Sequence, residues 1–190
     1  SMERDGYEAD KIRLFVMNLK TGEKKEYTKD FDQNVGGLSW ADDNTIYFIS
    51  DYHATDEIYK LTLNDGKIDK LTEGVHNYTS VIPVNDSLIA TKVSMSKPAE
   101  IYKVDPTTGK DTELSFVNKG ILDQLTMGKV ESRWIKTTDN KQMLTWVIYP
   151  PHFDPNKKYP AILYCEGGPQ STVSQFWSYR WNFQMMAANG

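Results

Sequence analysis

The sequence has little of what marks several common classes of protein. It contains one cysteine, Cys165, so no internal disulfide can form. No run of 18 apolar residues is present, which excludes an ordinary membrane-spanning helix. Lys and Arg number 22 against 26 Asp and Glu, and the net charge of −4 offers no basic surface for nucleic acid or anionic lipid. We therefore expect a globular protein that binds neither.

Metal-binding patterns are equally scarce. The three histidines, His53, His76 and His152, are scattered and lack the spacing of metal ligands, so we interpret them as surface or turn residues. Residues 42–44, Asp-Asp-Asn, lack the glycine and the terminal glutamate of a calcium loop and instead predict a hairpin turn. The sequence thus predicts no metal and no cofactor.

The first two thirds of the chain contain an internal repeat. Residues 14–23 resemble residues 58–67, and both resemble residues 101–110. Each copy predicts a strand, a tight turn in which glycine takes a positive φ, and a second strand ending near residue 28, 72 or 115. The turn glycines stand 44 and 43 residues apart: Gly22, Gly66 and Gly109.

Two further strands are predicted between successive hairpins, in residues 37–49 and 80–90. Four short strands in about 43 residues are typical of a β-propeller blade, with Trp40 as a residue of the blade core. An antiparallel meander or sandwich with evenly spaced turns is the alternative. Because a closed propeller needs at least four blades, two units and part of a third would leave sheet edges open.

The last third changes character. Residues 116–125 read as a connector, and residues 130–136 and 142–149 predict two strands around an Asp-Asn turn. The apolar run 161–165 predicts a strand buried on both faces, as in a parallel α/β sheet. Residues 176–189 predict a helix whose aromatic side chains pack on a sheet or a domain interface.

These last segments resemble a known family. Residues 154–164, Asp-Pro-Asn-Lys-Lys-Tyr-Pro-Ala-Ile-Leu-Tyr, and then 167–171, Gly-Gly-Pro-Gln-Ser, are similar to the opening of the catalytic domain of the prolyl oligopeptidase family of serine peptidases. The acylaminoacyl-peptidase and dipeptidyl-peptidase branches are the most similar. That family joins a β-propeller to an α/β-hydrolase domain. The resemblance implies the following division: 1–117, the C-terminal part of a β-propeller with two to three blades; 118–128, a connector; and 129–190, the start of an α/β-hydrolase domain truncated before the nucleophile.

The resemblance also implies a Ser-His-Asp triad and an acyl-enzyme. No G-x-S-x-G motif occurs in these 190 residues, so we expect the triad beyond residue 190 and no activity in this chain alone. The family places a backbone N–H in the oxyanion hole, and Gly168 matches that position. Glu166 stands where the dipeptidyl-type branch has tyrosine and the acylaminoacyl type commonly histidine. We hypothesise that Glu166 positions a basic side chain or a free α-amine, although spacing alone also fits a plain turn with a structural carboxylate.

The function implied is an exopeptidase that removes dipeptides or acylated residues from the N-terminus of oligopeptides. Its partners would be the oligopeptide substrate, the rest of the same polypeptide, which closes the propeller, and a second copy in a homodimer. We expect a soluble protein of the bacterial periplasm or cytoplasm. Two other functions stay open: a non-catalytic β-repeat binding module and an α/β-hydrolase esterase. A continuation without G-x-S-x-G would favour the binding module.

Overall fold

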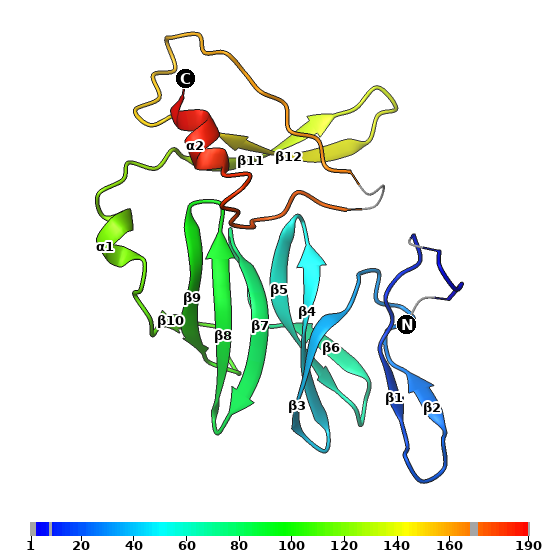
Figure 1. The fold of residues 1–190 in the computed structure, drawn as a ribbon. Coiled ribbons are helices and arrows are strands. Elements are labelled where there is room, and N and C mark those ends of the chain that lie inside the picture. Colours follow the sequence, from blue (N-terminus) through cyan, green and yellow to red (C-terminus); the bar gives the residue numbers. More distant parts are fainter. Residues whose placement is uncertain (1–2, 8, 168–170, 190) are drawn as a thin grey trace.

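A computed structural model describes residues 3–7, 9–167 and 171–189, and most of its regular structure is antiparallel β-sheet (Figure 1). The chain begins with a short hairpin of β1 (Phe15–Met17) and β2 (Lys24–Glu26). A first unit follows, made of β3 (Gly36–Asp42), β4 (Thr45–Tyr52), β5 (Thr55–Thr62) and β6 (Lys67–Lys70). The second unit repeats it with β7 (Asn77–Val84), β8 (Ser87–Ser94), β9 (Lys97–Val104) and β10 (Asp111–Glu113). The predicted four-strand repeat is confirmed.

The two units are joined more by side chains than by backbone pairing. A single parallel pair, Asp56 with Asn77, connects β5 to β7 and makes the two units one eight-stranded sheet. Within the described residues this sheet does not close on itself. One apolar cluster fills the space between the two units, and a second lies between the first unit and the β1–β2 hairpin. The first contains Tyr47, Ile58, Tyr78, Val81, Leu88, Ala90 and Val104, and the second Leu14, Val35, Ile46, Phe48, Tyr59 and Leu61.

The repeat includes a side-chain contact at the end of each copy. The hydroxyl groups of Thr28, Thr72 and Ser115 accept hydrogen bonds from the backbone N–H groups of the residues that open the three copies, at 2.8, 2.9 and 2.8 Å. These donors are Leu14, Ile58 and Ile101. The turn glycines Gly22, Gly66 and Gly109 have φ of 74°, 71° and 70°, as predicted. At Gly109 a Cβ would also lie 1.9 Å from the Leu71 carbonyl oxygen, so only glycine fits there.

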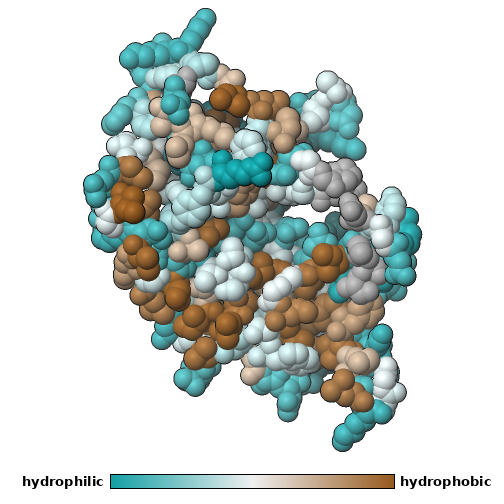
Figure 2. Space-filling view, in the orientation of Figure 1, coloured by the Kyte–Doolittle hydropathy of each residue, from teal (hydrophilic) through white to brown (hydrophobic). Residues whose placement is uncertain are grey.

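Exposed apolar side chains mark the faces that these units leave uncovered. Figure 2 shows such side chains over the sheet-bearing part of the molecule, and Ile82, Val84 and Ile101 of the second unit are among the exposed ones. Trp40, on β3, is 55% exposed, so its prediction as a blade-core residue is wrong. The reason is position: within the described residues β3 pairs only with β4 and forms an edge of the sheet, and Trp40 lies near the end of that edge.

Of the remaining elements, the hairpin of β11 (Val130–Lys136) and β12 (Gln142–Ile148) and the helix α2 (Phe183–Ala188) lie above the upper ends of the strands in Figure 1, and α1 (Lys119–Leu122) lies to the left of β9. Helix α1 lies inside the predicted connector, and β11 and β12 form the predicted hairpin. Its turn residue Asn140 has a φ of 64°, as the Asp-Asn sequence favours. No helix in the described ranges is long and apolar enough to cross a bilayer.

Two predictions for the last third are wrong. Residues 161–165 form no strand, and Ile162 and Leu163 are 80% and 82% exposed. A strand buried on both faces needs neighbouring strands, and none in the described part of the chain pairs with this run. The predicted helix shrinks to α2 (Phe183–Ala188), because the Ser178 hydroxyl accepts from the N–H groups of Arg180 and Trp181 and holds residues 178–181 in a turn.

Candidate functional site

Of the loop that the sequence singled out, the structure describes Glu166, Gly167 and Ser171, and all three are exposed. Glu166 is exposed and makes no hydrogen bond or ion pair within the described residues. Gly167 has open space where a Cβ would be, and its carbonyl accepts from the Ser171 hydroxyl. Gly168, the candidate oxyanion-hole donor, lies outside the described residues. The structure therefore places Glu166 at a surface from which it could contact a ligand, and in the described part of the chain no other polar side chain is paired with it.

Just beyond this loop, the chain is fixed to the top of the two units by Asn77. The Asn77 side-chain oxygen accepts from the backbone N–H groups of Asp56 and Gln175, both at 3.1 Å. Its amide nitrogen donates to the Ser174 hydroxyl at 2.8 Å, and the Gln175 side-chain oxygen accepts from the Met95 N–H at 3.3 Å. Asn77 and Gln175 are buried. The junction of the two units is thus also the anchor of the segment after the candidate loop.

A second anchor is formed by Gln184 on α2. Its oxygen accepts from the Gly128 N–H at 2.7 Å, and its nitrogen donates to the Gly128 carbonyl at 3.0 Å and to the Ser96 hydroxyl at 2.8 Å. A Cβ on Gly128 would lie 1.8 Å from the Tyr149 carbonyl oxygen. The predicted connector is therefore held between the second unit, the end of β12 and α2.

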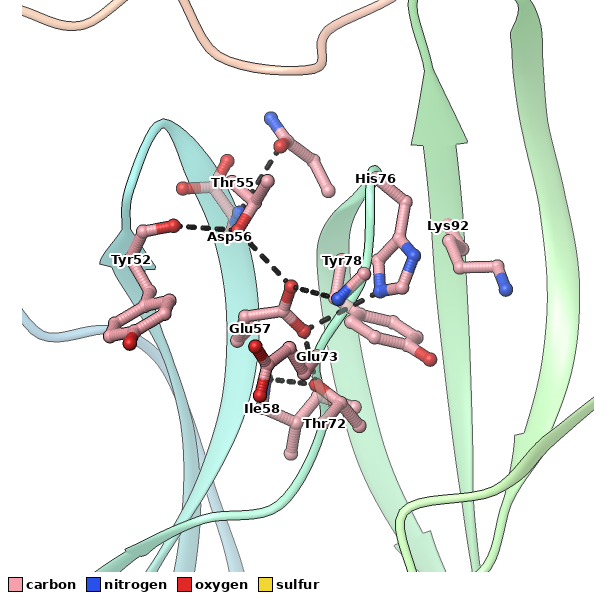
Figure 3. A network of polar contacts seen from close by, with 12 residues as sticks. Tyr52, Thr55, Asp56, Glu57, Ile58, Thr72, Glu73, His76, Tyr78 and Lys92 are labelled. Atoms are coloured by element: carbon pink, nitrogen blue, oxygen red, sulfur yellow. Dashed lines mark hydrogen bonds and ion pairs between the residues drawn. The ribbon is translucent and has the colours of Figure 1, made fainter. Parts of the chain in front are cut away.

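The main polar network of the first unit surrounds the buried carboxylate of Glu57 (Figure 3). One carboxylate oxygen accepts from the Thr55 hydroxyl and the Gly74 N–H, both at 3.1 Å, and the other accepts from the Thr72 hydroxyl at 2.6 Å. The His76 Nε2 lies 3.4 Å from that second oxygen, an ion pair when the imidazole is protonated. A buried carboxylate with this many donors is satisfied in its charged form.

The equivalent residue of the second unit has the same arrangement. Glu100 is buried, and its carboxylate accepts from the hydroxyl of Ser115 and from the backbone and side-chain nitrogens of Asn118, at 3.0 and 3.1 Å. Burial opposes its charged form, but these hydrogen bonds prevail and lower the pKa of Glu100 to about 2. Because the contact recurs in both copies, we interpret Glu57 and Glu100 as structural supports of the strand ends.

Next to this network, two carboxylates of the β4–β5 hairpin face each other. Asp51 and Asp56 are direct cross-strand partners. Burial, and then the neighbouring Asp51 carboxylate, raise the pKa of Asp56 to about 6. The hairpin tip beyond them has positive φ at His53 and Ala54, and the His53 ring lies 5.3 Å from the Trp134 ring of β11. This tip therefore contacts the β11–β12 hairpin.

The histidines follow the prediction in part. His53 and His152 have positive φ and occupy turns, whereas the His76 side chain is only 16% exposed and belongs to the Glu57 network. No group of three or more His, Cys, Asp or Glu side chains in the described ranges could hold a metal ion.

Sequence reasoning missed the roles of Glu57, Asn77 and Gln184. A signal for the first was present: Glu-Ile-Tyr-Lys occurs at 57–60 and again at 100–103, at equivalent places in the repeat. Nothing local marks Asn77 or Gln184, since their partners lie 98 and 56 residues away.

The chain is similar over its whole length to proteins named as dipeptidyl-peptidases. No protein-family model matches the chain. The relatives it does match support a peptidase of the prolyl oligopeptidase family, as the resemblance of its last third predicted. It is 50% identical over 191 residues to dipeptidyl-peptidase 5 of Porphyromonas gingivalis and 47% identical to that of Porphyromonas endodontalis. Each alignment covers 100% of this chain and 28% of the relative, so the chain spans about a quarter of the length of these curated relatives.

Solved structures show the same fold. A Pyrococcus horikoshii acylaminoacyl peptidase superposes with a TM-score of 0.75 at 23% identity, covering 94% of this chain and 26% of that protein. Porphyromonas gingivalis dipeptidyl peptidase 4 superposes with a TM-score of 0.64 at 20% identity, again over 94% and 26%. Because both identities are below 25%, these likenesses show a shared fold alone.

Proposed function

We propose that the protein to which these 190 residues belong is a serine exopeptidase that releases dipeptides from the N-terminus of oligopeptides. The observation that carries the proposal is the 50% identity, along the entire chain, to a dipeptidyl-peptidase 5. In the proposal, a serine, a histidine and an aspartate outside this chain form the triad, and peptide cleavage proceeds through an acyl-enzyme. Residues 1–117 supply propeller blades, 118–128 the connector and 129–190 the beginning of the hydrolase domain.

The proposed activity is tested on the whole protein with three matched substrates. A dipeptidyl coumarin amide with a free α-amine should be hydrolysed, and a serine-directed fluorophosphonate should abolish the reaction. The same substrate with an acetylated α-amine tests the acylaminoacyl alternative, and a short-chain ester tests the esterase. Faster turnover of either alternative substrate would overturn the dipeptidyl assignment. The 190-residue chain, run in parallel, should show no turnover.

Gly168 is proposed to donate its backbone N–H to the oxyanion of the tetrahedral intermediate. Replacing Gly168 by proline removes that donor, and kcat should fall by about 100- to 1,000-fold. Gly168→Ala keeps the N–H and is the matched variant, with a much smaller loss expected. Gly167→Ala is a second control, because a Cβ there meets open space. Equal losses in the proline and alanine variants would contradict the assignment.

Glu166 is proposed to position the free α-amine or a basic side chain of the substrate. Its exposed and unpaired carboxylate supports this role, since no contact within the described residues has to be broken. Glu166→Gln should raise KM for free-amine substrates by about tenfold and leave acetylated ones unchanged. Glu73→Gln changes another exposed carboxylate elsewhere and serves as the control. An unchanged kcat/KM across all substrates would rule the role out.

A further inference from the structure

A groove lies between the two units and is lined by residues of the turns that join β3 to β4 and β7 to β8. Figure 1 shows these two turns at the lower ends of the units. It encloses about 350 Å³, within the range of small-molecule sites, about 300–1,000 Å³. The first unit supplies one wall and the second unit the other. The lining includes Trp40, Asp42, Tyr47, Lys60, Pro83 and Pro106.

The floor of the groove carries donors that the protein leaves unused. Tyr47 and Lys60 are direct cross-strand partners on β4 and β5, so their side chains lie on the same face of the sheet. Within the described residues neither the Lys60 ammonium nor the Tyr47 hydroxyl has a hydrogen bond or ion pair, although Tyr47 is 95% buried as a residue and Lys60 is half-buried. Burial and the Asp42 carboxylate raise the pKa of the Tyr47 phenol, which therefore stays protonated and able to donate.

The opposite charge is also present. Asp42 lines the same groove, and of its two carboxylate oxygens one accepts from the Asn44 N–H at 2.8 Å. Within the described residues no ion pair joins Asp42 to Lys60, although both residues line the same groove. A half-buried cation and an anion held apart in this way present complementary charges to the two ends of a short zwitterion.

We propose that this groove binds a free dipeptide, with its carboxylate on Lys60 and Tyr47 and its ammonium group on Asp42. The exposed face of Trp40 and the rings of Pro83 and Pro106 form an apolar wall for a side chain of the dipeptide. The charge pattern selects a small zwitterion by itself. The choice of a dipeptide rests on the proposed function, because a dipeptidyl-peptidase would release that class of product.

The experiment measures binding to the 190-residue chain by calorimetry and by two-dimensional NMR at low salt. Three probes differ only at their ends: alanyl-phenylalanine, its N-acetyl form and its C-terminal amide. The free dipeptide should bind about tenfold or more tightly than either capped form, because each cap removes one charge-assisted contact. Its binding should shift the amide signals of residues 40–47 and 83–88.

Two variants assign the two ends of the ligand. Lys60→Met should remove the preference for a free carboxylate and keep the preference for a free amine, and Asp42→Asn should do the reverse. Asparagine can still accept from the Asn44 N–H, so this variant preserves the turn. Lys103→Met, an exposed lysine on β9, is the matched control and should bind like the parent chain.

Several results would overturn the proposal. These are equal binding of all three probes, no binding at millimolar concentrations, binding of acetate alone as strong as that of the dipeptide, or an equal effect of Lys60→Met and Lys103→Met. Because the experiment measures binding, its outcome is independent of the peptidase assays. If the whole protein did not release dipeptides, the reason for naming a dipeptide would be lost, but the proposed zwitterion site would not be contradicted.

Discussion

Replacing Glu57 by glutamine tests whether this buried carboxylate supports the fold. The carboxylate accepts three hydrogen bonds, from Thr55, Thr72 and the Gly74 N–H. The Thr72 hydroxyl accepts from the Ile58 N–H, which leaves its own proton aimed at Glu57. A glutamine keeps one acceptor oxygen but places an NH₂ group against donors on the other side.

The cost follows from this geometry. One charge-assisted hydrogen bond is lost and one buried donor is left without an acceptor, which together should lower the free energy of unfolding by about 2–3 kcal/mol. Glu100→Gln removes the equivalent support in the second unit and should cost a similar amount. Glu73→Gln is the control: its side chain is 75% exposed, so the change should stay within about 0.5 kcal/mol.

The assay is urea unfolding at pH 7, followed by tryptophan fluorescence and far-UV circular dichroism, with the midpoint and slope fitted for each variant. If Glu57→Gln were as stable as Glu73→Gln, the carboxylate would not be the acceptor on which this strand end depends. If Glu57→Gln were more stable than the parent, the buried charge would destabilise the fold. Destabilising charges of this kind are retained at functional sites.

Two further perturbations separate local causes in the same chain. Asp56→Asn should stabilise the protein at neutral pH. Because the pKa of Asp56 is raised to about 6, the folded state binds this proton more tightly than the unfolded state does. The parent protein therefore loses stability as the pH rises from about 4 to about 6. Over that interval the free energy of unfolding of the parent should fall by about 1–2 kcal/mol, allowing for solvent screening, and that of the variant should change little. Urea midpoints from pH 4 to 7 measure the difference, and equal pH profiles would contradict the assignment. Gly128→Ala should lower the free energy of unfolding by about 3 kcal/mol or expose the amides of α2 to hydrogen exchange. The reason is that the added Cβ would collide with the Tyr149 carbonyl oxygen and break the contacts of Gly128 with Gln184. Gly120→Ala, where a Cβ meets nothing within 4 Å, should be neutral or slightly stabilising, and similar losses in both glycine variants would show that the collision is relieved without cost.

The repeat shows how much of the fold local sequence specifies. Alternating apolar residues and a glycine at each turn predict the hairpins correctly, because side-chain alternation and positive φ are properties of a few neighbouring residues. A short stretch, residues 154–171, was also enough to show the family resemblance. The 50% identity to a dipeptidyl-peptidase 5 along the whole chain supports it.

Tertiary structure decided what depends on distant partners. The run 161–165 has the composition of a buried strand, but a strand forms only where another supplies hydrogen bonds, and in the described residues none does. Trp40 is apolar enough for a core, and the edge position of β3 leaves it beside a groove.

The polar sites divide in the same way. The sequence determined that Glu57 and Glu100 occupy equivalent places in a repeat, and only packing showed that both are buried acceptors at strand ends. Asp42 and Lys60 lie 18 residues apart in the chain and carry no motif. Their charges line one groove because β4 pairs with β5 and the second unit packs against that face, an arrangement that no local pattern records.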